Sequence, residues 1–383
     1  MSSSLSCRAC GSTSRLPLPL PHPFQSMVSD GKIRLAPLRK ASCISCGLVN
    51  HWRSLSQEEI RDVYNSEYDL GAVPSAGDAM RALRYAPAIA ELGNLQDAAN
   101  ILEVGCGSGA VLSALLRQQP KGHFLGLEAA PQLSNVRTDS GIEIRRCFIE
   151  DLRGVDGKFD LVYAINVIEH AADPEAFLMA IARQLSNNGI VVIVFPDGMN
   201  PNLELLFADH ISSFTSHSLD LIARRAGLKI TYSEQVSRFE DFQVVVLAHE
   251  ENRASPSAVK SDPSFHVLHN RRAEYLLKWS ALDSSLQSKI KNASDVMAFG
   301  AGETAALLRA YAPETWKRVS ALVVDEPTSG HSLGKRLLRY SDLEPSYGAV
   351  IVVATHPRSQ LHFFERLEAR GFKAAKWDHD IGQ

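Results

Sequence analysis

The sequence predicts an α/β protein with a seven-stranded, Rossmann-like core, a cysteine-rich module before the core and a small Rossmann-like α/β domain after it. Three observations predict this organisation. An apolar strand breaks into a glycine turn and restarts as an amphipathic helix within residues 101–116. Two C-x-x-C pairs lie within the first 46 residues, and a second strand, glycine turn and helix occupy residues 296–310. We expect the domains at residues 1–75, 76–250 and 265–383, with a polar linker at 251–264.

Composition places the chain among ordinary globular proteins. Its 383 residues are 45% hydrophobic and 22% charged, which suits two or three domains. No run reaches the 18 or so apolar residues that would span a bilayer, and the N-terminus lacks a secretory signal, so we expect a cytoplasmic protein. The net charge of −3 argues against a dedicated nucleic-acid binder, although residues 1–53 carry seven Lys or Arg against one acid.

The four N-terminal cysteines predict a zinc site. Cys7 and Cys10 form the first pair, Cys43 and Cys46 form the second, and a glycine follows each pair. Each pair places two thiolates on one tight turn, so the two pairs supply all four ligands of a closed, structural Zn²⁺ site. Disulfides are the alternative, which a cytoplasmic location disfavours. The 32 residues between the pairs exceed the usual spacing of about 15–20, so we expect a long loop there.

The glycine turn of the core predicts a nucleotide-type ligand. It has the form E-x-G-x-G-x-G, with Glu103 two residues before Gly105, followed by Gly107 and Gly109. The glycines allow a sharp turn and close approach of a ligand, and the next helix begins with unpaired N–H groups. Dinucleotide folds place the third glycine one position later, where this chain has Ala110. A turn without a ligand is the alternative.

This pattern resembles motif I of the class I S-adenosylmethionine-dependent methyltransferases. Glu128 ends the next strand, 23 residues after Gly105, where an acid would accept the ribose hydroxyls. The family usually holds the adenine after the third strand, which implies that role for Glu150, with Asp151 beside it. Asn166 opens a segment after the fourth strand that is similar to the family's segment at the methionine end.

The other strands and the C-terminal region complete the predicted organisation. The later core strands are expected at residues 123–127, 142–148, 159–165, 190–195, 228–233 and 242–247, and the family's final pair is antiparallel. In the C-terminal region, a G-x-G-x-x-A turn follows a strand at residues 296–299, and the next strand ends in Asp325. This turn fits the dinucleotide pattern in part, so ligand binding and a purely structural role are both open.

A cysteine-knuckle zinc module, a class I methyltransferase core and a small α/β unit, in that order, look like the sugar C-methyltransferases. The resemblance implies S-adenosylmethionine as cofactor, a nucleotide-linked 4-keto-deoxysugar as substrate and methylation of carbon. The family has a Glu-His pair and an aromatic after strand five, where this chain has Asp209, His210 and Phe214, an acid one methylene shorter. Tyr68 lies in the region whose tyrosines hydrogen-bond the enolate in that family, and a packed aromatic is the alternative.

The expected chemistry needs a base. A neighbouring ketone makes a C–H bond acidic enough to form an enolate, and a histidine held by a carboxylate can take that proton near pH 7. We expect His210 to be this base, with Asp209 orienting it or sharing the role. The alternative is that His210 caps the adjacent helix, whose N-cap would be Ser216. His170, which follows Glu169, is expected to shape the site beside the methionine end.

The sequence is also compatible with other functions. An RNA base methyltransferase could use the basic N-terminal segment to grip phosphates, but a Cys₄ zinc centre adds about −2 to that segment and basic-aromatic interleaving is absent. A redox protein that binds NAD in its C-terminal domain is a second rival, which the intact core motif disfavours. Methylation of oxygen or nitrogen on a small molecule is also open. We expect a small-molecule partner, no membrane and no nucleic acid.

Overall fold

The computed structural model describes residues 6–52, 58, 76–94, 99–118, 121–130, 136–137, 142–153, 158–234, 239–250, 263–327 and 329–382. The chain divides into two compact units, each built from several segments. The first unit comprises residues 1–17, 40–204 and 209–269, and the second comprises residues 18–39, 205–208 and 270–383. This division follows contacts in space, and the continuous domain boundaries expected from the sequence stay a prediction. Most of the expected linker, residues 251–262, lies outside the described residues.

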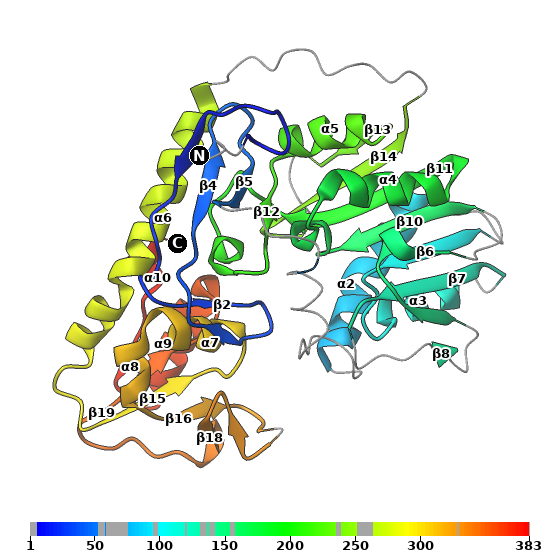
Figure 1. Cartoon of the computed structure of the whole chain (residues 1–383). Helices are drawn as coiled ribbons and strands as arrows, with labels where there is room; N and C mark the ends of the chain where they lie inside the picture. The colour runs from blue at the N-terminus through cyan, green and yellow to red at the C-terminus, as the bar shows by residue number, and fades with distance from the viewer. Residues whose placement is uncertain are drawn as a thin grey trace. The chain divides into compact units, whose positions relative to one another are not determined.

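An eight-stranded sheet forms the centre of the first unit, in the order β13-β14-β11-β10-β6-β7-β9-β8 (Figure 1). Its strands are β6 (Asn100–Val104), β7 (His123–Glu128), β8 (Val136–Arg137), β9 (Glu143–Arg146), β10 (Phe159–Ile165), β11 (Leu185–Pro196), β13 (Leu228–Ser233) and β14 (Phe242–His249). The five strands from β9 to β11 run parallel, and β14 is antiparallel to both of its neighbours. The predicted seven strands are all present, which confirms the class I methyltransferase fold, and β8 adds a two-residue edge strand.

Helices cover both faces of this sheet (Figure 1). They are α2 (Ala76–Gly93) and α3 (Ala110–Gln118) on one face, and α4 (Pro174–Gln184) and α5 (Ser216–Arg225) on the other. Alternate residues of β11 pack on opposite faces: Val191 and Ile193 join the apolar cluster of α4 and α5, whereas Val192 and Val194 join that of α2 and α3. A strand covered on both faces has a continuous apolar sequence, which is why β11 is recognisable without a structure.

The cysteine module has a sheet of its own within the first unit, in the order β1-β4-β5-β12. Its strands are β1 (Arg15–Pro17), β4 (Lys40–Cys43), β5 (Val49–His51) and β12 (Ser212–Ser213), and every pairing is antiparallel. The edge strand β12 comes from the segment that follows β11, far along the chain. The chain after β11 thus contributes one strand to the sheet of the N-terminal module.

The second unit is built on a six-stranded sheet, β17-β18-β16-β15-β19-β20. Its strands are β15 (Asp295–Phe299), β16 (Val319–Val324), β17 (His331–Ser332), β18 (Lys335–Arg339), β19 (Ala349–Val353) and β20 (Ala374–Ala375), and its helices include the C-terminal part of α6 (Pro263–Lys289), α7 (Glu303–Tyr311), α8 (Pro313–Arg318), α9 (Gln360–Ala369) and α10 (Asp378–Ile381). The small Rossmann-like domain is therefore present. The segment between the cysteine pairs contributes the hairpin β2 (Ser26–Met27) and β3 (Ile33–Arg34) to this unit, where a loop was expected.

The structure corrects the expected start of one helix and adds a strand that was not expected. α5 begins after Thr215, whose side chain accepts from the Ser218 amide at 3.0 Å, while the Ser218 hydroxyl accepts from the Thr215 amide at 2.9 Å. The expected N-cap at Ser216 was wrong by one residue, because this reciprocal pair of hydroxyls satisfies the helix start. β18 was missed because its residues Lys335–Arg339 are partly exposed and lack an apolar run. Among the described residues, no helix is long and apolar enough to cross a membrane.

Candidate active site

The glycine turn joins β6 to α3 at the carboxyl edge of the parallel strands. Gly105 has φ of +72°, and a Cβ there would lie 2.4 Å from Cγ2 of Val167. Gly109 has φ of +74°, with Cδ1 of Ile144 3.0 Å from the position of a Cβ. Both positions therefore require glycine, for conformation and for space. The turn is built as the sequence indicated, at the edge where open α/β sheets bind ligands.

Glu128 lies against this turn at the end of β7. Its Oε2 accepts from the Gly107 amide at 2.8 Å, and its Oε1 accepts from the Ala130 amide at 2.9 Å. These bonds fix the carboxylate beside the glycines, and each oxygen keeps a further lone pair for a ligand hydroxyl. Its role as a ribose-binding acid stays a prediction.

Glu103 lies inside the sheet. Its side chain is 1% exposed, and its Oε2 accepts from the Tyr163 hydroxyl at 2.9 Å. Burial raises the pKa of Glu103 to about 8, although the Tyr163 hydrogen bond acts in the opposite direction. Glu103 is therefore a neutral acid at pH 7 that links β6 to β10 below the turn.

The other residues expected at the cofactor lie at the same edge. Glu150 and Asp151 fall in a 3₁₀ turn, Ile149–Asp151, which follows β9. Asn166 follows β10 with φ of +56°, and its buried Oδ1 has no hydrogen-bond partner among the described residues. A buried amide oxygen without a partner is costly unless a ligand donates to it, so this atom fits the polar end of a bound cofactor.

A buried histidine pair lies beside this edge. The rings of His170 and His210 meet edge to face, with centroids 4.7 Å apart. Nδ1 of His170 lies 3.1 Å from the Asp209 carbonyl oxygen and 3.5 Å from Oδ2 of Asp209. Nδ1 of His210 lies 3.7 Å from Oε2 of Glu204. Nδ1 of His210 thus approaches the Glu204 carboxylate, whereas Asp209, expected to orient His210, lies against His170 and also raises the pKa of His210.

Burial controls the protonation of this pair. It lowers the pKa of His210 well below the usual value, and the neighbouring His170 lowers it further. Burial also lowers the pKa of His170, against the opposing effects of Asp209 and Glu128. Both imidazoles are therefore neutral near pH 7, as a proton acceptor must be.

Three ionisable residues complete the surroundings of the pair, and no motif in the sequence pointed to two of them. Lys40 is 3% exposed, its Nζ lies 3.4 Å from the Glu204 carbonyl oxygen, and burial lowers its pKa to about 8. Glu204 is fixed by a short hydrogen bond from the Ser213 hydroxyl. Glu169, visible in the sequence only as the neighbour of His170, is 1% exposed, and burial raises its pKa to about 8. Tyr68 lies outside the described residues.

This geometry agrees with a comparison with known protein families. Residues 78–233 match the family model of a methyltransferase domain. The chain therefore carries a methyltransferase domain, which holds the glycine turn, Glu128, Asn166 and the histidine pair. The sequence motifs lie in β6, β7, β9 and β10 of this domain and in the turns that follow these strands.

Curated relatives align with part of this methyltransferase domain. The ubiquinone biosynthesis O-methyltransferase of Bartonella quintana is 29% identical over 99 residues, and that of Xylella fastidiosa is 36% identical over 98 residues. Each alignment covers 24% of this chain and 39% of the relative. The solved plantazolicin methyltransferase BpumL in complex with SAH has a TM-score of 0.37 at 14% identity, over 46% of this chain and 86% of that one.

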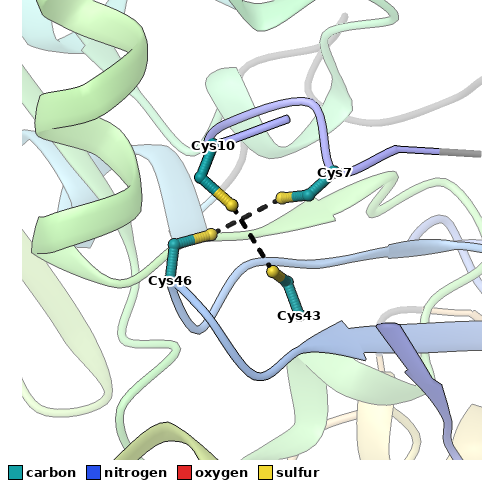
Figure 2. A group of neighbouring side chains, drawn as sticks. All are labelled: Cys7, Cys10, Cys43 and Cys46. Atoms are coloured by element: carbon teal, nitrogen blue, oxygen red, sulfur yellow. Dashed lines mark hydrogen bonds between the residues drawn. The ribbon is translucent and has the colours of Figure 1, made fainter. Parts of the chain in front are cut away.

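The four cysteines before the methyltransferase domain converge on one point (Figure 2). Their Sγ atoms lie within 4.8 Å of one another, with Cys7 and Cys46 at 3.5 Å and Cys10 and Cys43 at 3.6 Å. All four are free thiols, and these separations are far longer than a disulfide bond. A tetrahedral ion with Zn–S bonds of about 2.3 Å separates its sulfurs by roughly 3.8 Å. The donor set therefore fits Zn²⁺.

The two cysteine turns have the same backbone design. In the first, the amide of Gly11 donates to the Cys7 carbonyl at 2.8 Å, and in the second the amide of Gly47 donates to the Cys43 carbonyl at 2.9 Å. Both glycines have φ above +70°. This repeated turn directs the two thiols of each pair toward the same centre, which explains the C-x-x-C-G sequence of both pairs.

The cysteine module also supports the segment that carries His210. The His51 amide donates to the Ile211 carbonyl at 3.3 Å, one residue beyond His210. Nδ2 of Asn50 donates to Oγ of Ser212 at 2.9 Å, and Oγ1 of Thr215 donates to the Cys46 carbonyl at 3.1 Å. The second cysteine turn and the histidine pair are thus joined through a short, hydrogen-bonded strand.

Proposed function

We propose that this chain is an S-adenosylmethionine-dependent methyltransferase that methylates a carbon beside the ketone of a nucleotide-linked deoxysugar. The observation that carries the proposal is the buried, neutral His210 facing Glu204 within the methyltransferase domain, close to the edge that holds Glu128 and Asn166. The charge of Glu128 acts on His170, so the histidine pair lies within electrostatic reach of the expected ribose site.

S-adenosylmethionine, when bound, supplies a methyl group on a good leaving group, so the protein must chiefly generate and position a nucleophile. Glu128, Asn166 and the amides of the glycine turn would hold the cofactor. His210 would accept the proton from the carbon beside the ketone, and the C–H electron pair would form the enolate of the substrate. The carboxylates of Glu204 and Asp209 would then stabilise the imidazolium.

The same residues support a second candidate. The aligned relatives carry the name O-methyltransferase, and a buried neutral histidine can also take a proton from a hydroxyl group. Methylation at oxygen differs from methylation at carbon in one respect that can be measured without turnover, because only carbon methylation requires a C–H bond to ionise.

Solvent exchange separates the two candidates. The protein would be incubated in D₂O with a nucleotide-linked 4-keto-deoxysugar and S-adenosylhomocysteine, which cannot supply a methyl group. Carbon methylation predicts deuterium at the carbon beside the ketone, and predicts that His210→Ala abolishes the exchange. Absence of exchange in wild type, together with methyl transfer to the same sugar in a parallel reaction with S-adenosylmethionine, would reject the enolate and leave the O-methyltransferase candidate.

For the cysteine module we propose one structural Zn²⁺ held by Cys7, Cys10, Cys43 and Cys46. All four donors are thiolates and no position is left for water, so the ion would have no part in methyl transfer. The geometry of the four sulfurs and the repeated backbone turns support this role.

A further inference from the structure

We propose that Glu169, His170 and His210 form a second metal site in the methyltransferase domain, which takes one divalent cation of the Zn²⁺, Co²⁺ or Ni²⁺ class. The site itself stands on geometry alone, whereas the inhibition derived from it below rests on the proposed function. Imidazole and carboxylate donors together suit this class of ion.

The three donors already lie together. One carboxylate oxygen of Glu169 and one nitrogen from each of His170 and His210 are within 4.8 Å of one another. Ligands at about 2.1 Å from a tetrahedral ion are roughly 3.4 Å apart, so modest side-chain movement would close the site. The donors come from a 3₁₀ turn, Ile168–His170, and from the segment before β12, so the fold and not the local sequence brings them together.

Glu169 supplies an independent sign of a missing ligand. Its side chain is 1% exposed, and neither carboxylate oxygen has a hydrogen-bond partner in any other described residue, while its own backbone N–H acts on it. A buried carboxylate without a partner is unfavourable, and a bound cation would remove that cost. Its position within reach of two imidazoles makes a shared ion the natural partner.

The surroundings resemble the outer shell of a metal site. Metal-binding histidines usually hold their other ring nitrogen on a carboxylate or a carbonyl. Nδ1 of His170 lies 3.1 Å from the Asp209 carbonyl, and Nδ1 of His210 lies 3.7 Å from the Glu204 carboxylate. We therefore expect Nε2 of each ring to be the ligand atom.

The charge around the site also favours a cation. Three carboxylates that are at least 94% buried, those of Glu169, Asp209 and Glu204, lie near one buried cation, Lys40. Arg81 acts on Glu169 as well. A divalent ion that replaced the proton of Glu169 would lie among these carboxyl groups.

Binding at this site would oppose the proposed catalysis. An ion on His210 occupies a nitrogen lone pair that the base needs for the substrate proton. Metal and proton would therefore compete, and methyl transfer would fall as the second site fills.

Cobalt titration tests the site directly. The full-length protein, with its cysteine site already loaded with zinc, would be titrated with Co²⁺ and followed by visible absorption. We expect one further equivalent with weak d–d bands and no sulfur-to-cobalt charge transfer, because the donors are nitrogen and oxygen. Glu169→Gln should weaken this binding by at least about 100-fold, since one of its three protein ligands is lost.

A matched control variant distinguishes loss of the metal site from misfolding of the protein. Glu103→Gln also replaces a buried acid of the methyltransferase domain by its amide, yet Glu103 bonds Tyr163 and lies outside the histidine cluster. It should bind the second Co²⁺ as wild type does, and His170→Asn should not. Absence of the second equivalent in wild type, or unchanged binding in Glu169→Gln with a native circular dichroism spectrum, would overturn the site.

Methyl-transfer activity measured with and without Co²⁺ tests the metal site and the proposed function separately. Co²⁺ that binds and suppresses methyl transfer in parallel supports both. Co²⁺ that binds, is lost in Glu169→Gln and leaves methyl transfer unchanged would retain the metal site and reject His210 as the base.

Discussion

At the scale of single residues, burial decides the chemistry of the site. His210 and Glu169 are ordinary titratable residues in the sequence, and burial moves their pKa values in opposite directions. Both become neutral near pH 7, the histidine as a proton acceptor and the glutamate as an acid. A sequence can point to such residues, but their burial and their partners come from the fold.

Replacing His210 by alanine should separate binding from chemistry. We expect S-adenosylhomocysteine to bind with unchanged affinity, because His210 is not among the residues that hold the cofactor, and turnover to fall by roughly 10²-fold or more. Calorimetry and a methyl-transfer assay measure the two quantities. Turnover within a factor of about two of wild type would reject the base.

Glu204→Gln tests the carboxylate that the structure places beside His210. The amide keeps the size of the side chain that faces His210 but cannot stabilise an imidazolium. We expect kcat to fall by about 10-fold while KM is unchanged, with a smaller effect for Asp209→Asn. The reverse order would favour Asp209 as the orienting residue, as expected from the sequence.

The raised pKa of Glu103 should make the free energy of unfolding depend on pH. Its pKa is about 8 in the folded protein and 4.5 as the ordinary value, so between these pH values the folded state binds more protons than the unfolded state. The free energy of unfolding should therefore fall as pH rises through this range, by up to about 1.4 kcal/mol per pH unit. Glu103→Gln should remove the share of this dependence that Glu103 contributes, and urea denaturation of variant and wild type at pH 5 and pH 8 measures it. An equal difference between variant and wild type at both pH values would contradict the raised pKa.

At the scale of elements, short turns place the functional groups. The glycine turn and the two cysteine turns each use glycines with positive φ to direct backbone or side-chain atoms at one point. β12, only two residues long, ties the His210 segment to the cysteine module.

Gly105→Ala should disrupt the turn. The new Cβ would have a strained φ and would lie 2.4 Å from Val167, so we expect a loss of about 2 kcal/mol or more in unfolding free energy and weaker cofactor binding. Gly330→Ala is the control, because a Cβ there has no atom within 4 Å and no positive φ is present. Equal stability of the two variants would show that the turn tolerates a side chain.

The cysteine module predicts one zinc per chain. We expect elemental analysis to find about one Zn²⁺ in wild type and in Cys147→Ser, a cysteine outside the cluster, and almost none in Cys43→Ser. Loss of the metal should also lower the melting temperature, since the ion joins two distant turns. Full zinc content in Cys43→Ser would reject this ligand set.

At the scale of the whole molecule, the sequence predicted the two α/β sheets well and their edges poorly. The buried stretches of β6, β10 and β11 are mostly apolar because both faces are covered, whereas β18 is partly exposed and was missed. The cysteine pairs and the glycine turn were found because their spacing is local. Glu204, Glu169 and Lys40 meet only through the fold, so no spacing in the sequence could reveal them.

In the proposed reaction, His210 generates a carbon nucleophile that accepts the methyl group. The most direct measurement is ¹³C NMR of a nucleotide-linked 4-keto-deoxysugar after incubation with the protein and S-adenosylmethionine labelled in its methyl group. Carbon methylation predicts a new methyl signal coupled to a ring carbon beside the ketone, absent with His210→Ala. A label found on oxygen, or on no sugar although the cofactor binds, would contradict it.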